Sequence, residues 1–159
     1  LALRNLVALC PADASGVLTL AVHDRVASLA VTREATLYVA RWADAGLEVL
    51  AGELDKAEGE LLGGEFAGPE LDALVLEIQR SLDYYHHELG QRPASCVLLA
   101  PLVVDVPELP QRISQALGLE VSWLAPEELV ECAEPATPGQ WAHCTTALGA
   151  ALRAPEALQ

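Results

Sequence analysis

Histidines that adjoin acidic, hydroxyl or thiol side chains are the residues of this chain best suited to chemistry. His23, Asp24 and Ser28 supply the three residue types of a Ser-His-Asp hydrolase. Adjacent residues of a strand point to opposite faces of a sheet, so His23 and Asp24 would face apart. The spacing therefore argues against a hydrolase triad.

The other three histidines belong to two pairs of adjacent residues, and the residue types of both pairs suit metal binding. His86 adjoins His87, and His143 adjoins Cys144. Because neighbouring residues on a helix point in different directions, neither pair can share a metal ion unaided. Histidines in the last turn of a helix more commonly complement the negative end of its dipole. We expect no catalytic residue, no metal and no other cofactor at these pairs.

The four cysteines also lack a pattern that indicates chemistry. Cys10, Cys96, Cys132 and Cys144 include no C-x-x-C pair and no zinc-like spacing. Three of them lie in or beside apolar runs, where cysteine behaves as a small hydrophobic residue. We predict reduced thiols in a cytosolic domain.

The overall charge disfavours two classes of partner. The chain has 23 acidic and nine basic residues, which give a net charge of −14. Nucleic acids and anionic membranes attract clustered Lys and Arg, and the basic residues here are scattered. No apolar run approaches the ~20 residues of a membrane span, and the N-terminus shows no signal sequence. We expect neither nucleic-acid binding nor membrane insertion by this segment.

The length of 159 residues suits one domain, residues 1–159. The composition is 52% hydrophobic but only 4% aromatic, so the core must consist mostly of Leu, Val and Ala. The chain begins at Leu1 and contains no Met. We therefore interpret it as a segment of a longer protein.

Residue patterns predict β-structure in the first third of the chain. Residues 16–24, 26–33 and 35–42 are short β-prone runs separated by one or two polar residues, typical of an antiparallel meander with tight turns. Residues 1–16 fit either a short helix or a strand. Residues 43–67 are acidic and interrupted by glycines, which predicts a loop or a reduced insertion.

A long amphipathic helix is predicted over residues 68–89. Gly68 suits the N-cap and Pro69 the first helical position, apolar residues then recur at helical spacing, and Gly90 follows as a natural stop. Of the aromatic pair at positions 84 and 85, we expect one ring buried and one exposed.

The remainder alternates between strands and helices. The predicted elements are a doubly covered strand at 95–104, a helix at 106–118, a strand at 119–124, a small helix near 126–131 and a final helix at 140–153. The predicted fold class is α/β: a three-stranded antiparallel meander followed by alternating helices and strands in one mixed sheet. This is the element order of a ribonuclease-H-like lobe of an actin-like ATPase.

Three motifs resemble one family. The run LVLEIQRSLDYYHHEL (residues 74–89) resembles the signature helix of the PilM and MshI proteins of type IV and MSHA pilus assembly. The closing TTALGAALR (145–153) resembles that family's small-residue final helix, and R-x-x-x-x-G from Arg41 to Gly46 is similar to the end of its meander. The resemblance extends over residues 18–153. It implies a two-lobed actin-like protein of which this chain is the second lobe, with the first lobe upstream.

The resemblance also implies where nucleotide would bind, and there the chain departs from the pattern. Actin-like ATPases begin the second lobe with Asp-[Leu/Ile/Val]-Gly; here Val22, His23 and Asp24 occupy that triplet. A carboxylate in place of the glycine would repel phosphate, by about 4 kcal/mol for unit charges ~4 Å apart at an effective dielectric near 20. Ala100 and Pro101 replace a Gly-Gly turn, and Pro lacks a backbone donor. Both nucleotide elements are predicted to be disabled.

Glu77, Arg80 and Ser81 on the long helix carry two interpretations. In related nucleotide-binding lobes, residues of this helix face the adenosine, which would make these three a residual ligand wall. Alternatively, Glu77 and Arg80 form a surface ion pair three residues apart, and Ser81 is an ordinary helix residue.

Three functions are consistent with the resemblance. The favoured one is a non-catalytic cytoplasmic scaffold of an MSHA or type IV pilus platform, held peripherally at the bacterial inner membrane. Its expected partners are cytoplasmic segments of inner-membrane pilus proteins, with a second copy of the chain as a further candidate. The alternatives are an ATP-binding actin-like lobe, which would use ATP and Mg²⁺, and the actin-like domain of a type II secretion protein.

Overall fold

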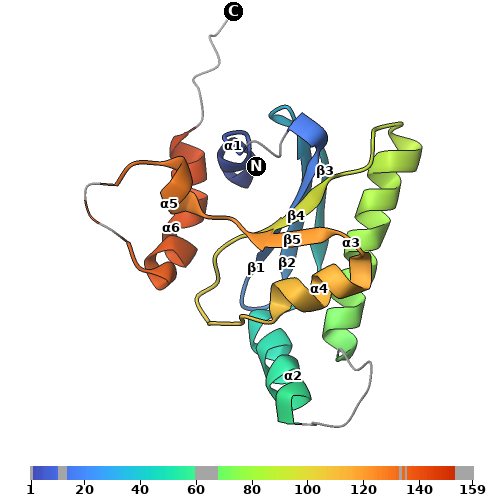
Figure 1. Cartoon of the computed structure of the whole chain (residues 1–159), viewed down its shortest axis with the longest axis vertical. Helices are drawn as coiled ribbons and strands as arrows, with labels where there is room; N and C mark the ends of the chain where they lie inside the picture. The colour runs from blue at the N-terminus through green and yellow to red at the C-terminus, as the bar shows by residue number, and fades with distance from the viewer. Residues whose placement is uncertain (1, 11–13, 60–67, 133, 135, 153–159) are drawn as a thin grey trace, which may run out of the picture.

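A five-stranded mixed sheet carries helices on both of its faces (Figure 1). The computed structural model describes residues 2–10, 14–59, 68–132, 134 and 136–152. The strands are β1 (Val17–Val22), β2 (Ala27–Arg33), β3 (Thr36–Ala43), β4 (Cys96–Leu99) and β5 (Glu120–Trp123). The helices are α1 (Ala2–Val7), α2 (Leu47–Gly59), α3 (Pro69–Asp83), the π-helical turn η2 (Tyr84–Glu88), α4 (Leu109–Leu117), α5 (Pro126–Leu129) and α6 (Pro138–Ala151).

The strand order β3-β2-β1-β4-β5 confirms the predicted meander and mixed sheet. β1, β2 and β3 pair antiparallel, whereas β4 pairs parallel with both β1 and β5. Glu34 and Ala35 join β2 to β3 with φ angles of 49° and 58°. Two successive positive φ angles are typical of a type I′ turn, whose backbone twist matches that of the two strands of a hairpin. The tight turn expected from the sequence is therefore present.

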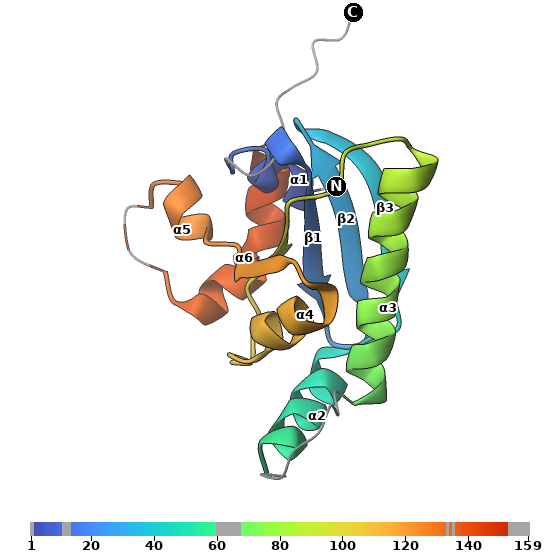
Figure 2. The ribbon, with the colours of Figure 1, turned by 45° about the vertical axis from the view of Figure 1, so that its right-hand side comes forward.

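β1 is the central strand and is buried along its whole length. Its side chains alternate between two hydrophobic clusters on opposite faces of the sheet. Leu18 and Leu20 belong to the larger cluster, which contains residues of α2, α3 and α4, and Val17 belongs to the smaller one beside α1. Figure 2 shows α3 on one side of the sheet and α1 with α6 on the other.

The predicted long helix is confirmed, with Gly68 at the N-cap and Pro69 in the first turn. Its apolar stripe packs on the sheet, and Tyr85 is fully buried while Tyr84 is exposed, as expected. The Tyr85 ring meets that of Tyr38 edge to face, with centroids 5.3 Å apart. The last turn is π-helical, and Gly90 ends it with φ at 63°.

Glu53 of α2 caps the start of α3 from a distance in sequence. Its carboxylate accepts hydrogen bonds from the backbone N–H groups of Glu70 (3.1 Å) and Leu71 (3.2 Å). Gly68 cannot cap with a side chain, and a Cβ there would overlap the Glu53 carboxylate. A carboxylate is favourable at the positive end of the helix dipole, so Glu53 ties α2 to α3.

The prediction of a loop over 43–67 is wrong for the residues that form α2. Leu47 and Leu50 are buried in the larger cluster, and burial of such a side chain stabilises by about 1.5–3 kcal/mol. That gain offsets the cost of Gly52 and Gly59, about 1 kcal/mol each. The glycines are visible in the local sequence, whereas this burial arises only from tertiary packing. Residues 60–67 lie outside the described residues.

Other elements differ from prediction mainly at their ends. Residues 2–7 form a helix, which decides between the two options left open. The predicted strand at 95–104 ends at Leu99, because Pro101 has no N–H to continue the ladder. The helix predicted at 106–118 begins only at Leu109, with Pro110 in its first turn. The final helix begins two residues early, where Thr137 and Gln140 form a capping box.

The small-residue helix α6 packs closely against α1. A Cβ on Gly149 would overlap the backbone of Ala2, so a larger residue would push the helices apart. Asn5 fixes the crossing by donating from Nδ2 to the Gly149 carbonyl over 2.7 Å. The glycine of the closing TTALGAALR motif is thus a packing residue.

The buried stripe of α3 predicts unequal effects for two leucines on that helix. Leu74 is fully buried, whereas Leu76 is 45% exposed. Leu74→Ala should lower the free energy of unfolding by about 2–5 kcal/mol, because it removes buried methyl groups and leaves a cavity. Leu76→Ala, the matched control, should change it by less than about 0.5 kcal/mol. Urea denaturation measures both; equal losses would contradict the described packing of α3.

Candidate functional site

The turn between β1 and β2 contains the triplet aligned with a phosphate-binding hairpin. The His23 N–H donates to the Val26 carbonyl over 2.8 Å, which closes the turn. The Leu47 N–H donates to the His23 carbonyl over 2.9 Å, which attaches the turn to the start of α2. Asp24 is exposed at the tip. The hairpin is therefore held from both sides, with its carboxylate facing solvent.

The turn at Ala100 and Pro101, the second place where the sequence departs from the actin-like pattern, lies directly beside this hairpin. β1 and β4 run parallel, with Leu20 opposite Leu99, so their carboxyl ends meet at one edge of the sheet. Ala100 extends the pairing by donating its N–H to the Leu20 carbonyl over 2.8 Å. Crevices outside the carboxyl ends of parallel strands are the usual ligand positions in α/β sheets. The structure thus brings the two sequence elements into one place.

A groove of about 740 Å³ opens at this edge. Val22, Asp24, Ala100 and Pro101 all line it, together with residues from α1 and α6. The lining residues are Leu3, Ala21, Val22, His23, Asp24, Arg25, Leu47, Ala100, Pro101, Val103, Ala142, His143, Thr145 and Thr146. We call it the hairpin groove.

The chemistry of the hairpin groove suits a phosphate poorly. Val22 offers no oxygen to a metal-bound water, and Pro101 offers no N–H to a phosphate oxygen. Arg25 supplies one positive charge beside the negative charge of Asp24. Within the described residues, no group of three or more His, Cys, Asp or Glu side chains is placed to hold a metal ion.

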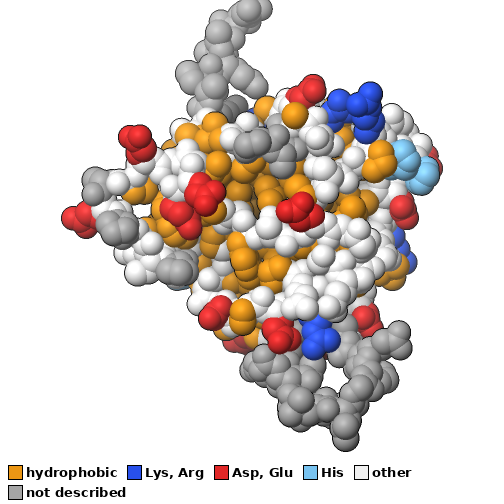
Figure 3. Space-filling view, viewed as in Figure 1, with side chains coloured by type: hydrophobic (Ala, Val, Ile, Leu, Met, Phe, Trp, Pro, Cys, Tyr) orange, Lys and Arg blue, Asp and Glu red, His pale blue; other side chains and the backbone are white. Residues whose placement is uncertain are grey.

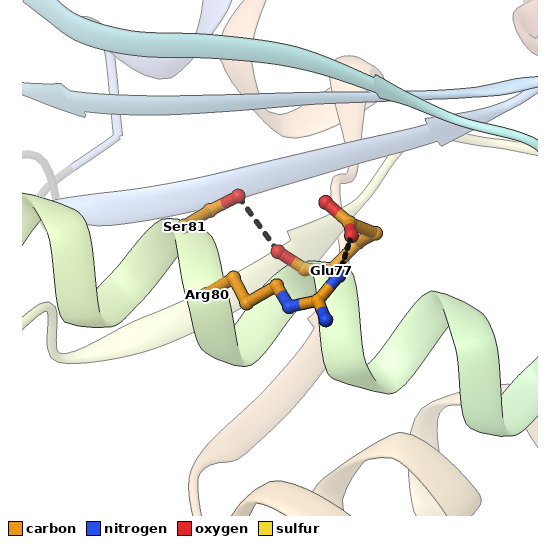
Figure 4. Close-up of polar contacts among 3 residues, drawn as sticks. All are labelled: Glu77, Arg80 and Ser81. Atoms are coloured by element: carbon orange, nitrogen blue, oxygen red, sulfur yellow. Dashed lines mark hydrogen bonds and ion pairs between the residues drawn. The ribbon is translucent and has the colours of Figure 1, made fainter.

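Glu77, Arg80 and Ser81 do not line the hairpin groove, and Figure 4 shows their contacts with one another. Arg80 Nη1 contacts Glu77 Oε1 at 2.6 Å, the predicted surface pair. Ser81 Oγ donates to the Glu77 carbonyl over 2.7 Å, and its side chain is fully buried. All three belong to α3, on the face of the sheet opposite α6. A nucleotide role for them stays a prediction.

The R-x-x-x-x-G spacing at the end of the meander has a structural basis. The Arg41 guanidinium lies over the Tyr84 ring, 5.3 Å from its centroid, a cation–π contact between β3 and η2. A Cβ on Gly46 would lie 2.5 Å from the Asp24 carbonyl oxygen. Glycine at that position lets the chain pass close behind the hairpin. The two ends of the motif thus fix α3 and the hairpin to the meander.

The hydrolase pattern is only partly assembled. Ser28 Oγ lies 3.4 Å from His23 Nε2, a proximity the sequence argument did not anticipate. No carboxylate among the described residues bonds the His23 ring; its neighbour is instead the Trp42 ring, with centroids 6.4 Å apart. Without a carboxylate to orient the imidazole, the arrangement lacks the third member of a triad.

Within the part of the chain that the structure describes, neither of the remaining pairs belongs to a group of three possible metal ligands. The His86 and His87 rings lie 4.5 Å apart in the π-helical turn. His86 Nδ1 is engaged with the Gln91 carbonyl at 2.6 Å. His143 and Cys144 are both exposed on α6.

The cysteines are not arranged for catalysis. Cys96, Cys132 and Cys144 are free thiols. Burial raises the pKa of the Cys96 thiol, an effect that the Ser95 hydrogen bond opposes. Because the thiolate is the nucleophile, a raised pKa makes Cys96 a core residue rather than a reactive one.

Comparison with known proteins identifies the fold. No protein-family profile matches the chain, and no functionally characterised protein matches it significantly in sequence. Among solved structures it is similar to a PilM–PilN type IV pilus biogenesis complex (TM-score 0.61, 18% identity, 94% of this chain and 50% of that one). It is also similar to the ethanolamine utilization protein EutJ of Carboxydothermus hydrogenoformans (0.52, 17%, 93% and 53%) and to an Alp12 filament (0.52, 10%, 95% and 51%).

These likenesses confirm the actin-like α/β fold predicted from the sequence. The chain spans about half the length of the solved structures it matches. No helix within the described residues is long and apolar enough to cross a bilayer.

The close approach at Gly46 predicts that the hairpin depends on this glycine. Gly46→Ala should lower the free energy of unfolding by about 1–3 kcal/mol, because the added Cβ meets the backbone of Asp24. Gly52→Ala is the matched control: nothing lies within 4 Å of a Cβ there, and alanine favours the helix by about 1 kcal/mol. Urea midpoints measure both, and amide NMR shifts at 23–25 report hairpin displacement. An unchanged midpoint in Gly46→Ala would contradict this packing.

Proposed function

We propose that this chain is the second lobe of an actin-like protein of a type IV pilus assembly platform, of the MSHA type. We propose further that it works by binding other proteins, on the cytoplasmic side of the bacterial inner membrane. Its partners would be cytoplasmic segments of inner-membrane pilus proteins. The first lobe would precede residue 1, which agrees with the chain's span of about half the solved structures it resembles.

Two independent features support the pilus assignment. The α3 sequence EIQRSLDYY resembles the signature helix of the PilM and MshI proteins. The overall fold is similar to a structure described as a PilM–PilN type IV pilus biogenesis complex, over 94% of the chain. The type II secretion alternative shares the fold but matches the α3 motif less well.

The hairpin groove carries the proposal that the lobe binds partners rather than turning over ATP. The pair Val22 and Asp24 is distant in sequence from the pair Ala100 and Pro101, yet all four residues line the same groove. By the resemblance, the first pair replaces residues of the phosphate-binding hairpin, and the second pair replaces the Gly-Gly turn beside the adenosine.

Calorimetry with Mg-ATP tests the absence of nucleotide binding. We expect no binding with micromolar affinity, either by the 159-residue chain or by the longer protein that contains it. Val22 provides no metal ligand, and Asp24 repels phosphate. Asp24→Gly, which removes that charge, is the matched variant and should bind at least as well as the parent chain. Micromolar binding by the parent protein would overturn the inert-lobe proposal in favour of the ATP-binding alternative.

Affinity capture tests the identity of the partners. The longer protein is immobilised. It should retain cytoplasmic segments of pilus-platform membrane proteins and should not retain the corresponding segments of a type II secretion platform. Segments of identical composition with scrambled sequence control for non-specific charge attraction to a lobe of net charge −14. Retention of the secretion segments instead would replace the pilus assignment with the secretion one.

A further inference from the structure

A second, larger groove opens on the α5 side of the molecule. Its volume is about 1380 Å³, and it runs between the 101–106 loop, the end of β5, α5 and the start of α6. Figure 3 shows apolar side chains gathered across this face, between β5 and the α5–α6 region, with acidic side chains around them. We call it the α5 groove.

The α5 groove combines a buried apolar floor with exposed apolar walls. Leu124 and Trp141 are buried and form part of its lining. Val103, Val104 and Trp123 line it too, with 47%, 47% and 38% of their surfaces exposed. A contiguous apolar surface bordered by polar residues marks interaction sites on soluble proteins. The groove therefore has the character of a binding surface.

Acidic side chains border this apolar surface. Among the described residues that line the α5 groove, four are acidic and none is Lys, Arg or His. The acidic residues are Asp105, Glu127, Glu128 and Glu131. Walls of one sign focus the potential of a cleft, so the α5 groove attracts cations.

The volume and charge of the α5 groove indicate which kind of ligand it binds. Its volume exceeds the ~300–1,000 Å³ typical of small-molecule pockets, which favours a peptide segment. A second copy of this chain would bring a further net charge of −14 against the acidic rim, and an anionic lipid surface would be repelled in the same way. A basic segment with apolar side chains matches both the walls and the rim.

We propose that the α5 groove binds a short amphipathic peptide segment of a partner protein, with aliphatic side chains against Val104 and Trp123 and Lys or Arg beside Glu127 and Glu128. The proposal deepens the partner-binding function and rests on it, since it names the surface and the chemistry of the partner. The apolar contacts supply the affinity, and the charged rim supplies orientation and association rate.

Binding measurements with labelled peptides test this inference. The probe is a short Leu/Lys peptide, compared with the same peptide carrying Glu for each Lys and with one carrying Ser for each Leu. We expect fluorescence anisotropy to show binding of the Leu/Lys peptide only, weakened by added salt. Amide NMR shifts should map to 101–106, 123–131 and α6. Equal binding of the Glu peptide, absence of binding, or shifts confined to other surfaces would overturn the inference.

Paired variants separate the α5 groove from the general acidity of the chain. Val104→Ser and the double change Glu127→Gln with Glu128→Gln should each weaken Leu/Lys peptide binding about tenfold. Leu76→Ser is the control for Val104→Ser, because Leu76 has a similar exposed fraction. Asp83→Asn with Glu88→Gln is the control for the double change, because it removes the same number of exposed negative charges. Both controls should bind the Leu/Lys peptide as the parent chain does. Equal weakening by the controls would overturn the assignment to this groove.

Failure of this inference is distinguishable from failure of the proposed function. If captured pilus segments bind but their NMR footprint avoids the α5 groove, the groove assignment fails while the scaffold function stands. If the Leu/Lys peptide occupies the α5 groove but no pilus segment is captured, the groove assignment stands and the pilus function fails.

Discussion

The parallel pairing of β1 with β4 is the constraint on which the rest of the structure depends. Leu20 faces Leu99 across the two strands, and the Ala100 N–H continues the ladder to the Leu20 carbonyl. This pairing joins the antiparallel meander to the α/β half of the chain. It also brings the β1–β2 hairpin beside the turn at Ala100 and Pro101, because the strands end at the same edge. The hairpin groove is a direct consequence of this register.

Two different kinds of packing cover the two faces of this sheet. On one face, α3 fills the space with large side chains, among them Leu74, Ile78 and Tyr85, and Glu53 ties α2 to its start. On the other, α6 presents small residues, and Gly149 lets α1 approach within backbone contact. Both motifs that resemble the pilus family are therefore packing elements.

Local patterns predicted most elements but not their tertiary roles. The meander, the α3 helix and the α/β alternation follow from residue periodicity and turn residues, which are local properties. α2 was missed because its stability comes from burial of Leu47 and Leu50 and from the hydrogen bonds of Glu53 to the start of α3, none of which is visible in a Gly-rich window. The proximity of Ser28 to His23 depends on the register of β1 and β2, which places Ser28 opposite Ala21, two residues before His23.

By itself, the sequence determined the fold class and two local properties: Val22 offers no oxygen to a metal-bound water, and Pro101 offers no backbone N–H to a ligand. Only the tertiary structure decided which residues share a site. It gathered Val22, Asp24, Ala100 and Pro101 around one groove, buried Ser81 beneath the sheet, and set Val104, Trp123 and the acidic residues of α5 around another. These groupings arise from strand pairing and helix packing between distant segments, which local residue patterns do not encode.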